Sequence, residues 1–580
     1  MSAARAADSL ACGAFDRAVH ASVARMTHGL SPMVLAGASA DWLMHLAFSP
    51  GKQMDLALLG LRQAMRLSRH AGECMAGHRE PCIRPLPQDR RFEAAQWQQW
   101  PFNLMWQSFL LSQQWWHAAA TDVSGVSHHH ELVVDFATRQ ALDLVSPSNF
   151  LATNPELIDQ TLRTGGANLV SGWRNWVEDM ARVAANRPPV GTEQFRPGIE
   201  VAVTPGEVVF RNHLIELIRY TPVTPAAYPE PVLVVPSWIM KYYILDLSPH
   251  NSLVRYLLEH GHPVYMVSWR NPDGADRDLG MEDYLHKGAM AAIDVVSQCH
   301  GGHCLHAVGY CLGGTLMAIA AARMAKDDDN RLCSLSLLAS QVDFSEPGEL
   351  ALFIDEAQLA WLDDLMASQG YLDGKQMSGA FALLNQRDLV FSRMVHDYLM
   401  GQRRPVTDLH AWNADATRMP FRQHREYLQS LYHHNDLARG HYRAGGKPVA
   451  LSDIRVPVFC LATERDTVSP WRSVYKVSLL TDTEVTFCLT SGGHNVGVVN
   501  PPGPGVRRSY RLDLRPQEGK YVDPEAWFAA APVHEGSWWP AWQAWLQQRS
   551  SAPMLIEHMP PSTHVCGSLG AAPGRYVLMP

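Results

Sequence analysis

The spacing of hydrophobic residues along the chain changes near residue 200. Before that point apolar residues recur at intervals of three and four, which places them on one face of a helix: Phe102, Met105, Trp106, Phe109 and Leu110. We therefore expect a helical N-terminal domain over residues 1–195, with a linker at Arg187-Pro188-Pro189. Its tryptophan-rich faces suit packing within the fold, against a partner chain or on an apolar particle, and packing within the fold or a dimer is favoured.

After residue 200, short apolar runs alternate with helical segments. Six runs are continuous, as in strands covered on both faces: 232–235, 264–267, 305–308, 335–338, 456–461 and 485–489. Two earlier runs, 208–210 and 214–218, are typical of an antiparallel pair. The pattern predicts an α/β domain over residues 196–580, built on a mostly parallel sheet. Residues 341–453 interrupt the alternation, and we expect them to form an inserted cap over the carboxyl edge of the sheet.

Composition narrows the class of protein. A chain of 580 residues is long enough for one large domain with appendages. Its 49 Lys and Arg against 57 Asp and Glu leave a net charge of −8, so nucleic acid is not an expected partner. No apolar run reaches the roughly 18 residues of a transmembrane helix, and the first residues do not follow a signal-peptide pattern. Ten scattered cysteines predict reduced thiols, and hence a cytoplasmic enzyme.

One peptide carries the composition of a nucleophile elbow. The apolar run 305–308 leads into Gly309-Tyr310-Cys311-Leu312-Gly313, and a helix rich in small residues follows. Such a turn needs small residues two before and two after the nucleophile, because strand and helix approach closely there. Helix amides at this point favour the thiolate of Cys311, and the Leu312 N–H would serve as an oxyanion donor. The alternative is a buried core thiol. This motif makes an α/β-hydrolase fold the expected fold.

Two further residues follow in the chain order of that fold, which is nucleophile, acid and then histidine. Asp466 comes directly after the run 456–461, and His494 comes directly after 485–489 behind two glycines. We predict that His494 is the general base for Cys311, and that Asp466 orients it or acts on a second hydroxyl. If each residue is considered alone, Asp466 could be a turn residue and His494 could be a histidine packed in a loop. The Ile239 N–H, after 232–235, is the second oxyanion candidate.

Metal and cofactor motifs are weak or missing. Consecutive His128, His129 and His130 would point in three directions from a helix, so a solvated or packing face is favoured. The turn Cys299-His300-Gly301-Gly302-His303-Cys304 could gather zinc ligands, but a tight turn is needed there in any case. The sequence contains neither a phosphate-binding Walker loop nor a dinucleotide fingerprint after a strand. We expect no metal and no cofactor.

At this level of detail the chain resembles the polyhydroxyalkanoate synthases, most closely class I. Ten short stretches carry the resemblance and cover most of the length: 27–32, 49–52, 146–150, 241–247, 268–273, 309–315, 412–417, 492–494, 500–502 and 536–540. One position departs from the pattern, because the family commonly has His after the acid of the triad and Thr467 stands here.

The resemblance implies a reaction and partners. Cys311 would attack the thioester of a short-chain (R)-3-hydroxyacyl-CoA, such as 3-hydroxybutyryl-CoA, and a 3-hydroxyl would then extend the ester chain. In the family the acid matching Asp466 is proposed to activate that hydroxyl, and His494 to deprotonate the thiol. It also implies a homodimer at the surface of cytoplasmic polyhydroxyalkanoate granules. A thioesterase or polyester hydrolase on the same scaffold, and a non-catalytic granule coat, remain alternatives.

Overall fold

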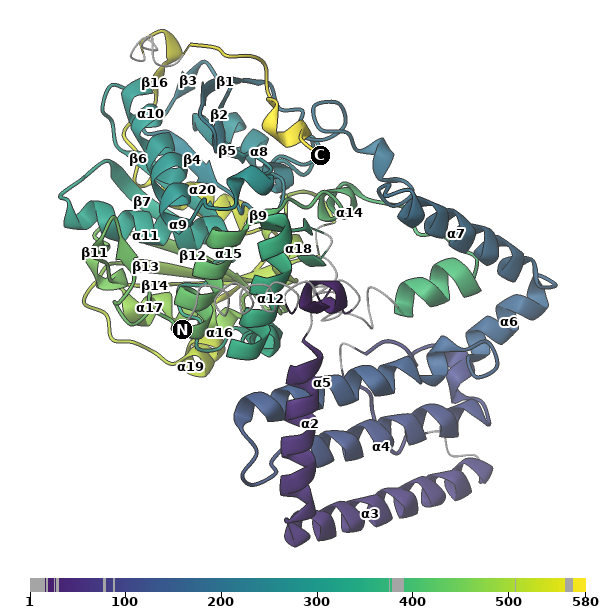
Figure 1. The fold of residues 1–580 in the computed structure, drawn as a ribbon. Helices are drawn as coiled ribbons and strands as arrows, with labels where there is room; N and C mark the ends of the chain where they lie inside the picture. The colour runs from purple at the N-terminus through teal and green to yellow at the C-terminus, as the bar shows by residue number, and fades with distance from the viewer. Residues whose placement is uncertain are drawn as a thin grey trace, which may run out of the picture. The chain divides into compact units, whose positions relative to one another are not determined.

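The structure is a computed structural model, and it describes residues 16, 19–24, 27, 31–76, 80–86, 89–374, 376, 377, 391–505, 507–558 and 567–580. Residues 28–30 of the 27–32 stretch, residues 378–390 of the expected cap, Cys12 and Cys566 lie outside this set. The chain divides into two compact units: Met1–Ser22, Gly191–Met377 and Thr407–Pro580 form the α/β unit, and Val23–Val190 with Ser378–Val406 form the helical unit (Figure 1). The predicted limits 1–195 and 196–580 and the cap stay predictions. The two units differ from these limits at Met1–Ser22, residues 191–195 and Ser378–Val406.

The helical unit is built from amphipathic helices, as the spacing in its sequence predicts. On α4 the residues Trp106, Phe109 and Leu110 are buried, and with Phe92 and Trp97 they form a small aromatic core. Among the described residues its longer elements are α2 Pro32–Ala47, α3 Pro50–Met75, α4 Phe102–Ala120, α5 His128–Leu144, α6 Pro155–Arg163, α7 Ala167–Ala184 and η9 Met394–Leu399. None of the described helices has the length and hydrophobicity to cross a membrane.

The α/β unit is centred on one large sheet with the order β1-β2-β5-β4-β6-β7-β12-β13-β14-β15. Its six central strands are parallel, and the antiparallel strands lie at the two edges. The expected strands are confirmed, whereas β14 and β15 were not predicted. The bounds are β1 Gly206–Arg211, β2 Ile215–Tyr220, β4 Val232–Val235, β5 Val264–Trp269, β6 Leu305–Tyr310, β7 Leu332–Leu338, β12 Val458–Thr463, β13 Val485–Thr490, β14 Ser509–Arg515 and β15 Val533–Glu535.

Helices cover both faces of this sheet. Successive side chains of a strand point to opposite faces, so Gly309 and His306 on β6 face opposite ways. Gly309 meets the start of α11, while His306 bonds to Ser550, just after α20. Helices on or beside the sheet include α8 Leu253–Glu259, η6 Tyr284–Met290, α10 Ala291–Cys299, α11 Leu312–Lys326, α16 Trp471–Tyr475, α18 His494–Val498, α19 Pro524–Ala530 and α20 Trp539–Gln547. Others, between β7 and β12 in the chain, are α12 Glu356–Gln369, α14 Asp408–Asn413, α15 Phe421–Glu426 and η10 Tyr427–His433.

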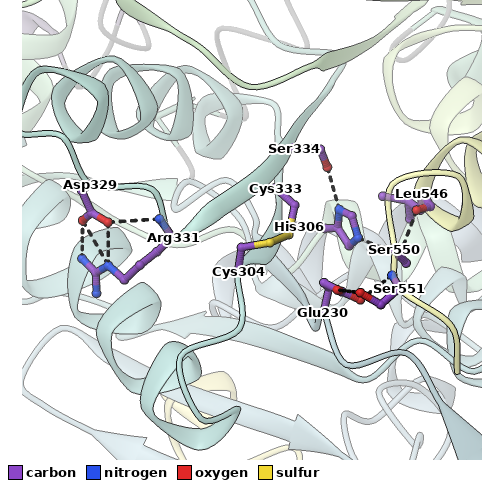
Figure 2. Close-up of a disulfide and its surroundings, with 10 residues drawn as sticks. All are labelled: Glu230, Cys304, His306, Asp329, Arg331, Cys333, Ser334, Leu546, Ser550 and Ser551. Carbon is purple, nitrogen blue, oxygen red and sulfur yellow. Dashed lines mark hydrogen bonds and ion pairs between the residues drawn. A yellow bond between two sulfur atoms is a disulfide. The ribbon is translucent and has the colours of Figure 1, made fainter. Parts of the chain in front are cut away.

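One expectation about the cysteines is wrong. The prediction of reduced thiols fails at Cys304 and Cys333, which form a disulfide (Figure 2). The reason is the strand register: Leu305 pairs with Leu332 where β6 and β7 begin, and this brings the two Cα atoms to 5.4 Å. Cys74, Cys82, Cys311, Cys460 and Cys488 are free thiols.

A buried histidine lies near this disulfide (Figure 2). His306 is fully buried, and its ring nitrogens pair with Ser334 Oγ at 2.8 Å and Ser550 Oγ at 3.0 Å. Burial, together with the charge of Arg549, lowers the pKa of His306 to about 4. The folded protein therefore holds this imidazole neutral at a pH where the unfolded chain protonates it.

Acid should destabilise the protein through this residue. Between pH 6.5 and pH 4 the unfolded state binds the proton and the folded state does not, so stability falls as the pH is lowered through this range. At pH 5 the contribution of His306 to the loss is about 2 kcal/mol. The melting temperature of His306→Gln should depend less on pH between 7 and 5 than that of the parent. The exposed His558→Gln should keep the parental slope, and an unchanged slope in His306→Gln would contradict the expectation.

Candidate active site

Cys311 occupies a sharp turn between β6 and α11. Its backbone dihedral angles are φ 52° and ψ −124°, a conformation that side-chain-bearing residues rarely adopt. Its N–H donates to the Leu338 carbonyl at 2.9 Å, which ties the turn to β7. The side chain is therefore presented at the carboxyl edge of the parallel strands, as in a nucleophile elbow.

The glycines around Cys311 are there because the backbones touch. A Cβ on Gly309 would lie 2.2 Å from Gly314 Cα, so strand and helix could not approach as they do. A Cβ on Gly313 would lie 2.1 Å from the Val235 carbonyl oxygen and 2.6 Å from that of Pro236. Both obstacles are main-chain atoms, which cannot rotate away as a side chain would. The expected role of small residues is thus explained atom by atom.

Adding one methyl group here should damage the site. Gly313→Ala should push α11 away from β4, and a displacement near 1 Å can cost about 100-fold in turnover. We expect a loss of that order in acyl transfer, with a lower melting temperature. The matched control is Gly72→Ala, also in a helix, where a Cβ meets nothing within 4 Å. That variant should keep full activity and equal or higher stability. Parental activity in Gly313→Ala would show that the contact is not needed.

The acid and the histidine meet at the same edge. His494 Nδ1 donates to Asp466 Oδ2 at 2.8 Å. Asp466 is itself fixed, because its Oδ1 accepts the N–H groups of Val468 and Ser469 at 2.9 and 2.8 Å, and Thr463 Oγ1 donates to its Oδ2 at 3.0 Å. With Nδ1 committed to the carboxylate, Nε2 is the nitrogen left for a proton from the nucleophile.

The charge state of His494 links all three residues. Burial by itself lowers the pKa of this imidazole, but the charges of Asp466 and Cys311 and hydrogen bonds to both raise it well above its usual value. Such an imidazole readily accepts a proton and holds it beside a thiolate. The structure therefore brings together the three side chains that the sequence nominated as nucleophile, acid and base.

A motif at the far end of the chain supports the histidine. The indole N–H groups of Trp538 and Trp539 donate to the carbonyl oxygens of Gly497 and Val498, both at 3.0 Å. These carbonyls belong to α18, the short helix that begins at His494. Both indoles are fully buried, so the bonds are shielded from water. The 536–540 stretch contributes to the family resemblance, but nothing in its spacing indicates this role.

A second support comes from the residues next to the nucleophile and the base. The Tyr310 hydroxyl donates to Asn495 Oδ1 at 2.7 Å, and Asn495 Nδ2 donates to Asn413 Oδ1 at 3.1 Å. The chain of bonds runs from the residue before Cys311, through the residue after His494, to the end of α14. The local sequence does not indicate this role for any of the three residues, because each bond joins segments distant in the chain.

The two oxyanion candidates lie in adjoining segments. The Leu312 N–H is at the first position of α11 and donates to no acceptor among the described residues. The loop that carries Ile239 follows β4, whose end contacts Gly313. Among the described residues, the Ile239 N–H donates to Ser237 Oγ alone, in a long bond of 3.4 Å that is weak enough to be exchanged for a stronger acceptor.

The histidine-rich segments at 128–130 and 299–304 are held by contacts within the chain. His130 Nδ1 bonds to Asp41 Oδ2 at 2.6 Å at the start of α5, and Cys304 is in the disulfide. Within the part of the chain that the structure describes, no three His, Cys, Asp or Glu side chains gather as a metal site requires.

The sheet, the elbow and the Asp466–His494 pair define an enzyme of the α/β-hydrolase fold. Family models agree: "alpha/beta hydrolase fold" matches residues 230–500, "Poly-beta-hydroxybutyrate polymerase N terminal" matches 11–52, and "Poly-beta-hydroxybutyrate polymerase (PhaC) N-terminus" matches 88–257. The chain belongs to the poly(3-hydroxyalkanoate) polymerase family, and it is therefore an acyltransferase.

Three relatives illustrate the match. The poly(3-hydroxyalkanoate) polymerase of Methylorubrum extorquens is 42% identical over 503 residues, covering 86% of this chain and 82% of its own. The PhaC subunits of the enzymes from Rhizobium etli and Cupriavidus necator are each 35% identical, over 517 and 515 residues. Those matches cover 87% of this chain in both cases, and 80% and 85% of the relatives.

Proposed function

We propose that this chain polymerises (R)-3-hydroxyacyl-CoA into polyhydroxyalkanoate, with release of CoA, through a covalent acyl-Cys311 intermediate. The observation that carries the proposal is a cysteine on the elbow beside a hydrogen-bonded Asp466–His494 pair, in a chain whose relatives are named poly(3-hydroxyalkanoate) polymerases. Nucleophile, base and orienting acid are the parts that acyl transfer requires.

Acylation comes first. His494 Nε2 takes the thiol proton of Cys311, and the thiolate attacks the thioester carbonyl. The Leu312 and Ile239 N–H groups donate to the oxyanion that forms. The bond between the carbonyl carbon and the CoA sulfur then breaks, and the departing thiolate takes the proton from His494. CoA leaves as a thiol and the acyl group remains on Cys311.

Elongation uses the same groups. The 3-hydroxyl of a second unit attacks the acyl-Cys311 carbonyl, while its proton passes to His494 or directly to Asp466. A new ester bond forms, the bond to Cys311 breaks, and the thiolate is restored. A thiol suits this exchange because a thioester gives up its acyl group readily to the next acceptor. Residues 341–453 would exclude water as a cap, since water would turn the cycle into hydrolysis.

Finer features of the proposal come from the resemblance. The elbow Gly-Tyr-Cys-Leu-Gly-Gly supports short-chain substrates such as 3-hydroxybutyryl-CoA. A homodimer at the surface of cytoplasmic polymer granules is the proposed assembly. Thr467, where the family commonly has His, makes acyl-chain preference the first property to measure.

The products separate polymerisation from hydrolysis. Purified protein with (R)-3-hydroxybutyryl-CoA should release CoA in step with insoluble polyester, and with little soluble 3-hydroxybutyrate. Six- and eight-carbon substrates should react more slowly than the four-carbon one. Soluble acid equal to the CoA released would identify a thioesterase, and no CoA release at all would exclude the proposed reaction.

A further inference from the structure

The loop after β4 is held along one side by a distant segment of the α/β unit. This loop, residues 236–241, carries the Ile239 N–H that we nominate as an oxyanion donor. The segment is 412–417, which begins in the last turn of α14. Met240 and Ala416 form an antiparallel bridge between the two. The loop therefore takes its shape partly from residues far along the chain.

One residue of the segment, Thr417, bonds to the carbonyl groups on both sides of Ile239. The Thr417 hydroxyl donates to the Trp238 carbonyl oxygen in a short bond. The Thr417 N–H donates to the Ile239 carbonyl oxygen at 3.1 Å. Thr417 is 1% exposed, so water does not compete for these acceptors. Both peptide units that flank Ile239 are thus tied to the same residue.

The first of these bonds sets the direction of the Ile239 N–H. The Trp238 carbonyl and the Ile239 N–H belong to one planar peptide unit, which is trans. In a trans peptide the two groups point in opposite directions, so a carbonyl turned toward Thr417 turns the N–H away from it. Donation to the carbonyl also polarises the peptide and makes its N–H a stronger donor. The hydroxyl therefore controls both the aim and the strength of this N–H.

Packing fixes the residue before this peptide but not the peptide itself. The buried ring of Trp238 lies against Trp269 and Tyr284, with centroid distances of 6.1 and 5.2 Å. These ring contacts hold the Trp238 side chain, and they leave the following peptide able to tilt about its bonds to the Cα atoms. The Thr417 hydroxyl is the group that bonds to this peptide and limits its tilt.

The same segment also reaches the base. Asn413, its second residue, accepts from Asn495 Nδ2 at 3.1 Å, directly beside His494. Segment 412–417 therefore contacts the loop of the oxyanion donor and the helix of the base. It is placed to align the two groups with each other.

From these contacts we propose that Thr417 is a positioning residue of acyl transfer, whose hydroxyl aims the Ile239 N–H at the oxyanion that forms on the thioester carbonyl. Thr417 acts through the peptide unit and not on the substrate itself. The inference rests on the proposed function, which supplies the oxyanion. It applies to every acyl transfer at Cys311, because each passes through such an oxyanion.

Thr417→Val is the test, because valine has the shape of threonine without the hydroxyl. The kcat of CoA release from 3-hydroxybutyryl-CoA should fall about 30-fold, since losing a whole oxyanion donor costs about 10²- to 10³-fold and here the donor is only misdirected. KM should change by less than about twofold, because the effect is on the transition state. Thr417→Ser keeps the hydroxyl and should retain at least about a third of the parental kcat. Parental kcat in Thr417→Val, or equal losses in both variants, would overturn the inference.

A matched control separates aim from stability. Trp412→Phe removes the indole N–H that donates to the Lys241 carbonyl at 2.7 Å, which belongs to a different peptide unit. Both Trp412→Phe and Thr417→Val lose one buried hydrogen bond of the same segment, so both should melt at a lower temperature. The kcat of Trp412→Phe should nevertheless fall by no more than about threefold. Losses of kcat that simply follow the melting temperature in both variants would mean a structural role and contradict the inference.

Ground-state binding gives an independent readout. In an uncleavable substrate analogue a methylene group replaces the thioester sulfur, so the carbonyl is present but CoA cannot leave. Calorimetry on chains that all carry Cys311→Ala should give the same Kd, within about twofold, with and without Thr417→Val. A Kd weakened by the same factor as kcat would show that Thr417 shapes the binding site rather than the oxyanion donor, and would overturn the inference.

Failure of this inference and failure of the proposed function give different results. If the parent makes polymer and Thr417→Val matches it, the inference alone is lost. If the parent is a thioesterase, Thr417→Val should still slow CoA release about 30-fold, because hydrolysis needs the same oxyanion donors. If the parent releases no CoA, the proposed function fails, and p-nitrophenyl butyrate becomes the acyl donor for the comparison. Equal cleavage of that ester by Thr417→Val and the parent would then overturn the inference as well.

Discussion

Cys311→Ala is expected to abolish CoA release from 3-hydroxybutyryl-CoA, with a loss of at least about 10⁴-fold, because it removes the sulfur that we propose to carry the acyl group. The protein should still fold, since the elbow geometry depends on the glycines and on the Leu338 carbonyl rather than on the sulfur. A thiol-reagent assay of CoA gives the rate, and mass spectrometry of the quenched parent should locate the acyl group on the peptide that contains residue 311.

The control is a free thiol elsewhere. Cys74→Ala removes a half-buried cysteine of the helical unit and should leave CoA release unchanged. Cys311→Ser keeps a nucleophile on the elbow, but a hydroxyl is a far weaker one at neutral pH, so it should retain only a small fraction of the activity. Parental turnover in Cys311→Ala would mean that the polymer-forming nucleophile is another group.

The second large effect is expected from Asp466→Asn, with a loss of about 10³- to 10⁴-fold. The carboxylate fixes the His494 ring through Nδ1 and helps to hold its pKa well above the usual value. An amide can bond to Nδ1 but cannot stabilise the imidazolium. Thr463→Val removes one donor to the same carboxylate, and it should cost only about tenfold.

Rapid-quench kinetics on Asp466→Asn also separate the two roles open to this residue. If Asp466 works only through His494, both the first burst of CoA and the later turnover should slow. If it activates the incoming hydroxyl directly, the burst should survive while chain growth stops. A variant that keeps both steps at parental rates would remove Asp466 from the mechanism.

Local pattern was enough to predict the framework of the site. Each of the three site residues follows a continuous apolar run, and the carboxyl ends of parallel strands meet at one edge of a sheet. Once the runs ending near 308, 461 and 489 are read as strands of one parallel sheet, the meeting of Cys311, Asp466 and His494 at its carboxyl edge follows. The role of the elbow glycines could be predicted from the sequence, because two backbones can approach this closely only where residues lack a side chain.

Contacts between distant segments were not predictable in this way. Trp538 and Trp539 each donate to a carbonyl of α18 that lies 41 residues earlier in the chain, and the hydrophobic pattern of neither segment indicates this contact. The Cys304–Cys333 disulfide depends on the register of β6 against β7, which single strands do not reveal. Helix α7 is amphipathic, but many of its hydrophobic side chains are exposed, because Gly172 and two asparagines make the inward contact instead.

The two buried indoles beneath α18 have a practical consequence for engineering. They fasten the short helix that carries the base to α20 and its lead-in, so the position of His494 depends on the last part of the chain as well as on the Asn413 contact from residues 341–453. Libraries that aim at new monomers by varying residues 341–453 should therefore leave intact Trp538, Trp539, the Asn413 contact to Asn495 and the bonds from Thr417 to the Trp238 and Ile239 carbonyls.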